Sequence, residues 1–324
     1  MNLPAGFKND GSDGSDGSDG SDGSDGSDGS DGSSGGTYAV SSVGAYSGKR
    51  TSLILAQALW STQGGITLGY NGIGNPDTSL APLPANKAFE RWSRDVRGQQ
   101  YEFELLSGVQ FNGGNPAAAT LRFPAGAVYV MNSPSYEKSV QSLKDELQKV
   151  FNLAALRPDR MNEILTQVAV PYSFFAMVLN LQPGRYRFTY ELMSAVYRFS
   201  TVVVMQFKHQ FRVRRPADRS PLIQPVLLTP GHGSYPAGHG TQGGFMAAIL
   251  KNLTGAPVGS ERADQLTKLA ARIGENRVVA GLHYPEDIAA GSALGTRLAD
   301  HFIAQSQVAG SALEWLWTKA KAEW

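Results

Sequence analysis

The chain has 324 residues, of which 41% are hydrophobic and 10% aromatic, enough for a substantial core in one large or two small domains. It contains no cysteine, which excludes disulfides, thiolate catalysis and cysteine-based zinc sites. The formal net charge of +1 hides an asymmetry, because an N-terminal tail carries eight of the 28 acidic residues and only one of the 29 basic residues. The rest of the chain has a surplus of eight positive charges but no basic run, which favours a small anionic ligand over nucleic acid.

The tail, residues 1–36, contains a strict Asp-Gly-Ser repeat over residues 10–33. No side chain of the repeat can build a core, so we expect a flexible, solvated tail followed by a single helical domain over residues 37–324. No signal peptide is visible, and the most apolar run, residues 168–181, is too short to span a membrane. The sequence therefore predicts a soluble protein and leaves its compartment open.

The apolar spacing after the tail is mainly that of helices. Residues 101–105 and 120–123 are expected to form short strands or irregular cover over a helical core. Proline and glycine punctuate the helical stretches. We therefore predict a mainly helical bundle with little or no β structure. The predicted helices cover residues 52–60, 85–96, 136–151, 159–168, 172–181, 190–211, 241–253, 260–280 and 285–304.

Three stretches between residues 208 and 287 contain side chains suited to a tetrahedral oxyanion. The first contains Lys208 and Arg215, with Pro216 directly after the arginine. Such cations neutralise phosphate-like anions, although each by itself is an ordinary surface charge. Because the proline stops the preceding helix, Arg215 is expected where the chain turns inward.

The second stretch is Pro236-Ala237-Gly238-His239, directly before a predicted helix. Free amides around Gly238 at a helix N-terminus bind anions without any particular side chain, and glycine lets the backbone come close to a ligand. His239 adds an imidazole that can move a proton. Taken alone, the stretch also fits an ordinary glycine-rich loop.

The third stretch contains Asn276-Arg277, then His283 and Asp287. Arg277 supplies a third cation. The Asp287 carboxylate, one turn after His283, can fix the tautomer of the imidazole and raise the basicity of its other nitrogen. Such an imidazole suits a ligand or a nucleophile. Taken alone, a histidine and an aspartate at this spacing are also a common pair on a helix surface.

Together, the three stretches resemble the superfamily that joins vanadium-dependent haloperoxidases, type-2 phosphatidic-acid phosphatases and bacterial nonspecific acid phosphatases. The signature of that superfamily is Lys-x6-Arg-Pro, Pro-Ser-Gly-His and Ser-Arg-x5-His-x3-Asp, and the resemblance covers about residues 190–305. It implies a helical bundle of that type. Two positions differ, since Ala237 and Asn276 stand where the family has serine. Losing the hydrogen bond from a hydroxyl to a charged oxygen of the ligand costs about 1–3 kcal/mol. The hydroxyl of Ser234 lies nearby in the sequence and could replace the missing one.

The resemblance implies two alternative chemistries for the same residues. In a phosphatase, His283 is the nucleophile that forms a phosphohistidine, and His239 protonates the leaving group. In a haloperoxidase, His283 is the direct ligand of a vanadate cofactor, and hydrogen peroxide oxidises a halide to hypohalous acid, with a small organic molecule as acceptor. Phosphate can occupy the same site. The oxyanion is held by Lys208, Arg215, Gly238 and Arg277, and the catalytic residues are His239, His232, Lys208 and Asp287.

His232, seven residues before His239, decides the main interpretation. Bromoperoxidases of the family carry a second histidine at that place, so the sequence favours a vanadium-dependent enzyme that oxidises bromide or iodide. The alternatives are the acid phosphatase and a structural or adhesive protein whose repeat tail is the working part. A homo-oligomer is also expected, because proteins of this family often pair through helices outside the signature.

Overall fold

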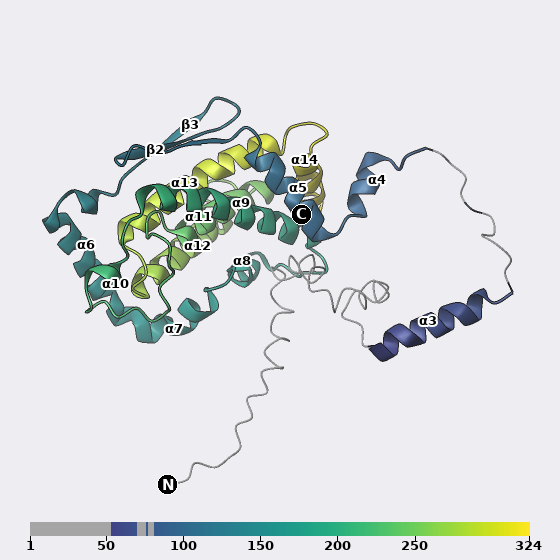
Figure 1. Cartoon of the computed structure of the whole chain (residues 1–324), viewed down its shortest axis with the longest axis horizontal. Helices are drawn as coiled ribbons and strands as arrows, with labels where there is room; N and C mark the ends of the chain where they lie inside the picture. Colours follow the sequence, from purple (N-terminus) through teal and green to yellow (C-terminus); the bar gives the residue numbers. More distant parts are fainter. Residues whose placement is uncertain (1–52, 70–75, 77–80) are drawn as a thin grey trace, which may run out of the picture. The chain divides into compact units, whose positions relative to one another are not determined.

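The computed structural model describes residues 53–69, 76 and 81–324 (Figure 1). The Asp-Gly-Ser repeat lies outside the described residues, so the division of the chain into a tail and one catalytic domain stays a prediction. The chain separates into two units, Met1–Arg97 and Gly98–Trp324.

The first unit contains two of the predicted helices. α3 (Leu53–Thr67) is longer than the helix expected over residues 52–60. The helix expected over residues 85–96 is divided between α4 (Ala85–Glu90) and the start of α5 (Arg94–Leu106). The predicted positions are therefore confirmed, but their ends are not.

α5 shows that the expectation of a strand over residues 101–105 is wrong. Tyr101, Phe103 and Leu105 alternate with two glutamates, which mimics the period of a strand. Tyr101 and Leu105 are fully buried, and they lie four residues apart on one helical face, whereas Phe103 is 67% exposed. The apolar residues at positions 101 and 105 therefore reflect burial of one side of a helix and not the alternation of a strand.

The second unit contains a small antiparallel sheet in the order β1 (Gln110–Asn112), β2 (Ala118–Arg122), β3 (Val128–Asn132). Leu121 on β2 is buried and lies opposite Phe111 on β1. The other expected short strand coincides with β2 and is confirmed. The prediction of a mainly helical fold with little β structure is also confirmed.

Helices make up most of the second unit, and their ends agree with the predicted ranges to within a few residues. The helical segments over residues 154–156, 216–219 and 312–321 have no counterpart among the predicted helices. In the described part of the chain, no helix is both long and apolar enough to cross a membrane. The bounds are η3 (Ser135–Lys138), α6 (Val140–Leu153), η4 (Ala154–Leu156), α7 (Arg157–Thr166), α8 (Tyr172–Leu179), α9 (Arg187–Phe211), α10 (Pro216–Arg219), α11 (Gly238–Leu253), α12 (Glu261–Val279), α13 (Pro285–Gln305) and α14 (Ala312–Lys321).

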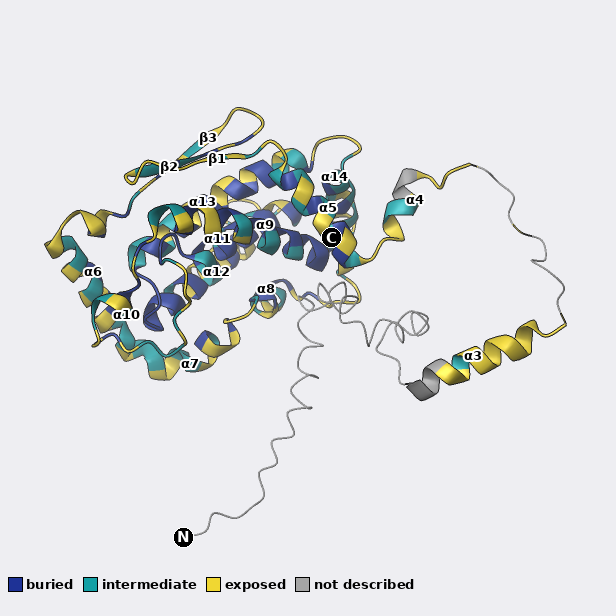
Figure 2. Ribbon diagram, in the orientation of Figure 1, coloured by how far each residue is buried: buried dark blue, intermediate teal, exposed yellow. Residues whose placement is uncertain are grey.

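α11 is the central helix of this unit and packs against α13, α12 and α9. Figure 2 shows buried residues gathered along these helices. Glycines set the separation between α11 and α13. A Cβ atom on Gly295 would lie 2.3 Å from the carbonyl oxygen of Thr241, and one on Gly291 would lie 2.5 Å from that of Ala237. Only glycine permits two backbones to approach this closely.

Candidate active site

The predicted site residues lie where four helices begin or end. Lys208 is in the last turn of α9, and Arg277 is in the last turn of α12. His239 is in the first turn of α11, and His283 lies two residues before α13. The helix packing therefore brings together the three stretches that the sequence singled out.

Arg215 contacts the segment between the end of α12 and the start of α13. It is buried and extended, and Pro216 after it begins α10. Its guanidinium donates to the carbonyl oxygens of Leu282 at 2.9 Å and His232 at 3.1 Å. Its Nη1 atom lies 3.3 Å from Nε2 of His283. Arg215 thus holds the backbone around His283 and one edge of its imidazole.

The other edge of the His283 ring faces Asp287, with 3.1 Å between Nδ1 and Oδ2. A carboxylate only accepts hydrogen bonds, so Nδ1 carries the hydrogen and Nε2 keeps a lone pair. The same assignment lets Nε2 accept from the Arg215 guanidinium. Burial, with the nearby charges of Lys208 and Arg215, lowers the pKa of His283 well below its ordinary value. His283 is therefore a neutral imidazole with a defined tautomer.

Asp287 is fully buried and is held by more than His283. Its carboxylate accepts from Tyr136 Oη at 2.6 Å, Ser234 Oγ at 2.5 Å and the Tyr284 amide at 3.1 Å. Burial raises the pKa of Asp287, and the donors of Ser234 and Tyr136 oppose that rise. The sequence analysis missed Tyr136, because it lies 151 residues before Asp287 and belongs to no motif.

Ser234 does not replace the serine missing at position 237. Its hydroxyl donates to Asp287 and lies 3.2 Å from Nδ1 of His283, on the Asp287 side of the ring. Ala237 is fully buried, and its amide donates to the Asp287 carbonyl oxygen at 3.0 Å. The expectation of a substitute hydroxyl is therefore wrong, and Ser234 instead supports the histidine and the carboxylate.

Lys208 is 3% exposed and points its ammonium at two backbone carbonyls. Nζ donates to the oxygens of Gly233 and Ser234, both at 2.8 Å. Burial and the charge of Arg215 lower the pKa of Lys208 to about 7. An anion bound beside this ammonium would oppose both effects and favour the charged form.

Arg277 is 1% exposed and only partly hydrogen-bonded. One Nη atom donates to the carbonyl oxygen of Ile164 at 2.9 Å and lies 3.4 Å from Oε1 of Gln167. Burial lowers the pKa of Arg277 to about 10. Its Nε atom is buried and finds no partner among the described residues. A buried donor without an acceptor is costly, and an oxyanion in the adjoining cavity would satisfy it.

His239 is oriented by Gln167, a second residue that the sequence analysis missed. His239 Nε2 donates to the Gln167 backbone oxygen at 2.7 Å, which leaves Nδ1 as the nitrogen that can take up and release a proton. Burial and the charge of Arg277 lower the pKa of His239 to about 4. Asn276, at the other position without the family serine, donates to Gln167 Oε1 at 2.9 Å. It therefore acts on the site through Gln167, a residue at the end of α7 that no sequence motif marks.

A cavity of about 200 Å³ collects the predicted residues. A Cβ atom on Gly238 would meet no atom within 4 Å, so open space lies beside the first turn of α11. The donor set suits a tetrahedral oxyanion, either phosphate or vanadate, and vanadate as a cofactor stays a prediction. Asp287 lies behind His283 and does not line the cavity. The predicted residues that line it are Lys208, Arg215, His232, Gly238, His239, Arg277 and His283.

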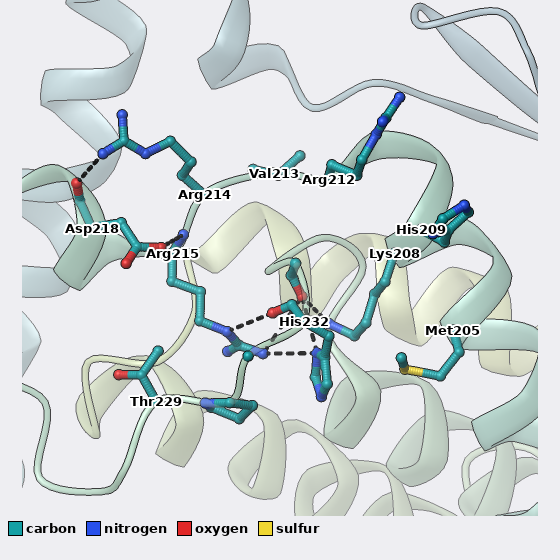
Figure 3. Close-up of a pocket in the computed structure, with 13 residues that line it drawn as sticks. Met205, Lys208, His209, Arg212, Val213, Arg214, Arg215, Asp218, Thr229 and His232 are labelled. Carbon is teal, nitrogen blue, oxygen red and sulfur yellow. Dashed lines mark hydrogen bonds between the residues drawn. The ribbon is translucent and has the colours of Figure 1, made fainter.

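His232 lies at the edge of this cavity and also lines a larger outer pocket. Figure 3 shows Lys208 and Arg215 pointing toward it from two sides. Its Nδ1 atom lies 3.2 Å from an Arg215 Nη atom, from which the unprotonated nitrogen can accept, and 3.3 Å from the Gly233 carbonyl oxygen, to which the protonated nitrogen can donate. Burial and the charge of Lys208 lower the pKa of His232. The side chain therefore takes part in holding Arg215, a role that is independent of any peroxide chemistry.

Comparison with known proteins supports a coarser assignment than the sequence interpretation. No protein-family profile matches the chain. Over 81 residues, or 25% of its length, the chain is 32% identical to a non-specific acid phosphatase from Salmonella typhimurium strain LT2, and it spans 28% of that protein's length. The crystal structure of a transmembrane PAP2-type phosphatidylglycerolphosphate phosphatase from Bacillus subtilis superposes with a TM-score of 0.39 and 16% identity, covering 53% of this chain and 90% of that one.

The main sequence interpretation, a vanadium-dependent haloperoxidase, is wrong. The sequence similarity is to an acid phosphatase, and nothing in it specifies a haloperoxidase. Hydrogen peroxide, a halide and an organic acceptor as reactants are unsupported. The single histidine on which that interpretation depended, His232, is accounted for by its contact with Arg215. The similarity is therefore to an acid phosphatase, one of the protein classes that the sequence motifs resemble.

Proposed function

We propose that the protein is a phosphatase that hydrolyses phosphomonoesters through a phosphohistidine at His283. The observation that carries the proposal is the orientation of the His283 imidazole. Asp287 binds the hydrogen on Nδ1, so the lone pair on Nε2 faces the cation-lined cavity. A neutral, oriented imidazole beside bound phosphate is what nucleophilic catalysis needs.

The first step transfers the phosphoryl group to His283. Lys208, Arg215 and Arg277 bind the non-bridging oxygens and stabilise the charge that develops on them. Nε2 forms a bond to phosphorus as the bond between phosphorus and the ester oxygen breaks. The leaving oxygen takes the proton from Nδ1 of His239, so the product is an alcohol and His239 becomes neutral.

The second step regenerates the enzyme. Water attacks phosphorus in line with the bond to Nε2, and the neutral His239 accepts its proton. Inorganic phosphate forms, Nε2 recovers its lone pair, and His239 is again protonated. Throughout, the Asp287 carboxylate stabilises the positive charge that His283 carries while it is phosphorylated.

The pH dependence follows from His239. In the empty cavity its pKa is about 4, because burial and Arg277 disfavour the charged ring. A bound phosphate ester adds negative charge and raises that pKa, so the acid form required for the first step is populated in the complex. The rate of alkyl phosphate hydrolysis is expected to fall as the pH rises above the pKa of His239 in the complex.

The proposal is tested by measuring phosphate release from an alkyl phosphate by the native protein and by His283→Ala. We expect release by the native protein and a loss of release in the variant, with both proteins folded as judged by thermal melting. A folded native protein that releases no phosphate from acidic to neutral pH would contradict the proposal, and so would an active His283→Ala variant. The structural or adhesive alternative concerns the repeat and stays a prediction.

A further inference from the structure

An outer pocket of about 560 Å³ lies beside the catalytic cavity. The two spaces share Lys208, Arg215 and His232 in their walls, so a molecule in one is adjacent to the other. The mechanism above uses only the inner cavity. The outer pocket is large enough to hold a second group of the substrate, one that does not react in the proposed mechanism.

The lining of the outer pocket is strongly cationic. Besides Lys208 and Arg215 it includes Arg212 and Arg214. The single carboxylate among its lining residues belongs to Asp218, and that carboxylate already accepts from the Arg215 amide at 2.9 Å. A pocket with this excess of positive charge attracts anions.

The backbone explains why two arginines lie together at the rim. α9 ends with Arg212 in the left-handed conformation at φ 49°, and the chain is then irregular to Arg215. Exposed and buried residues alternate, with Arg212 and Arg214 exposed and Val213 and Arg215 buried, as in an extended segment. The Val213 carbonyl oxygen accepts from the Ser234 amide at 2.8 Å and fixes this orientation.

The two rim arginines keep donors for a ligand. One Nη atom of Arg214 donates a hydrogen bond to the backbone oxygen of Asp218 at 2.7 Å. The other N–H groups of this guanidinium remain available to a ligand. Arg212 makes no side-chain hydrogen bond to any described residue. Figure 3 shows both side chains extending away from His232, while Lys208 and Arg215 point toward it. The cations thus form an inner and an outer set.

We propose that the outer pocket binds a second phosphate of the substrate, so that small bisphosphates are preferred over monophosphates of the same skeleton. The inference rests on the proposed function. One phosphate would lie in the inner cavity against Lys208, Arg215 and Arg277, and the exposed side chains of Arg212 and Arg214 would turn toward the second. Arginine suits this role because its guanidinium can donate two parallel hydrogen bonds to phosphate.

The test compares linear alkanediol bisphosphates of increasing length with the corresponding alkanediol monophosphates, with kcat/KM measured for release of the first phosphate. A bisphosphate has two equivalent ends, so a ratio of about two is expected without any subsite. We expect a ratio of about tenfold or more at the best chain length, because two arginines act on the second phosphate. Added salt should reduce that ratio, since the rim is exposed.

The double variant Arg212→Gln/Arg214→Gln should bring the ratio down to about two. Arg262→Gln is the matched control, because Arg262 is an exposed arginine at the start of α12 and lies about 22 Å along that helix from Arg277. It should keep the native ratio. A native ratio of about two at every chain length would overturn the proposal, and so would a double variant that keeps the native ratio.

Binding separates this inference from the proposed function. Calorimetry with alkane bisphosphonates and monophosphonates, which have no ester bond to cleave, reports the subsite without catalysis. Tighter binding of the bisphosphonate that is lost in the double variant would support the subsite even if no ester were hydrolysed. Equal affinities of the native protein for the two classes, in a protein that hydrolyses monophosphates, would overturn the subsite and leave the proposed function standing.

Discussion

Replacing Asp287 by asparagine tests the arrangement around the proposed nucleophile. The carboxylate accepts the Nδ1 hydrogen of His283 at 3.1 Å and three further hydrogen bonds. An amide in its place removes the negative charge and can turn an N–H group toward Nδ1. The imidazole then loses the partner that fixes its tautomer, and Nε2 can carry the hydrogen in place of the lone pair.

The expected loss follows from the hydrogen bond to a charged group. Removing such a bond costs about 2–3 kcal/mol, which corresponds to a fall in kcat/KM of about 30- to 150-fold. The assay is phosphate release from an alkyl phosphate by Asp287→Asn, with folding monitored by thermal melting. The variant should fold, because the hydroxyls of Ser234 and Tyr136 can rotate to accept from the new amide.

Tyr136→Phe is the matched control, because it removes a different donor from the same carboxylate. The bond between Asp287 and His283 remains, so kcat/KM should fall less than in Asp287→Asn. A folded Asp287→Asn variant with native kcat/KM would refute the reasoning. An equal loss in both variants would show that the carboxylate acts through the stability of the buried network and not through His283.

Three further predictions concern the acid, the cations and the fold. His239→Gln should lower hydrolysis of an alkyl phosphate by about 10²–10⁴-fold and that of nitrophenyl phosphate much less, because the nitrophenolate leaves without a proton; equal losses would remove His239 as the acid. Inhibition by sulfate, whose charge is constant over this pH range, should weaken as the pH rises above about 7, by up to about tenfold per pH unit. The reason is that Lys208 loses its charge in the unliganded site, so sulfate binding must take up a proton. Inhibition that does not change with pH would contradict this, whereas inhibition of Lys208→Arg should not change with pH. Gly295→Ala should lower the free energy of unfolding by about 1–3 kcal/mol, because its Cβ would lie 2.3 Å from the Thr241 oxygen; Gly184→Ala, where no atom lies within 4 Å of the added Cβ, should change it little, and similar denaturation midpoints for the two would argue against the close helix contact.

Much of the inner cavity could be predicted from the sequence, because its residues occupy helix ends that local signals mark. Pro216 and Pro285 are at the first turns of α10 and α13, and Arg215 and His283 lie one and two residues before them. Lys208 and Arg277 could be predicted from the spacing that they share with the signature of the superfamily that the sequence resembles. The helical class could also be predicted, because apolar residues recur at helical spacing from residue 136 onward.

The supporting residues could not be predicted, because only tertiary packing brings them to the site. Tyr136 reaches Asp287 across 151 residues, and Gln167 reaches His239 across 72. Neither lies at a fixed spacing from a motif. His232 could be found from the sequence, but its role could not be predicted, because that role depends on its contact with Arg215 in the folded protein.

The most direct test of the account is to locate the phosphoryl group in the protein during turnover. The native protein would be mixed with substrate, quenched rapidly under alkaline conditions that preserve phosphohistidine, and digested for mass spectrometry. The account predicts a phosphate on the peptide that contains His283, bonded to the imidazole, and none in His283→Ala. A phosphorylated residue elsewhere, or turnover without any phosphoenzyme while His283→Ala remains active, would contradict it.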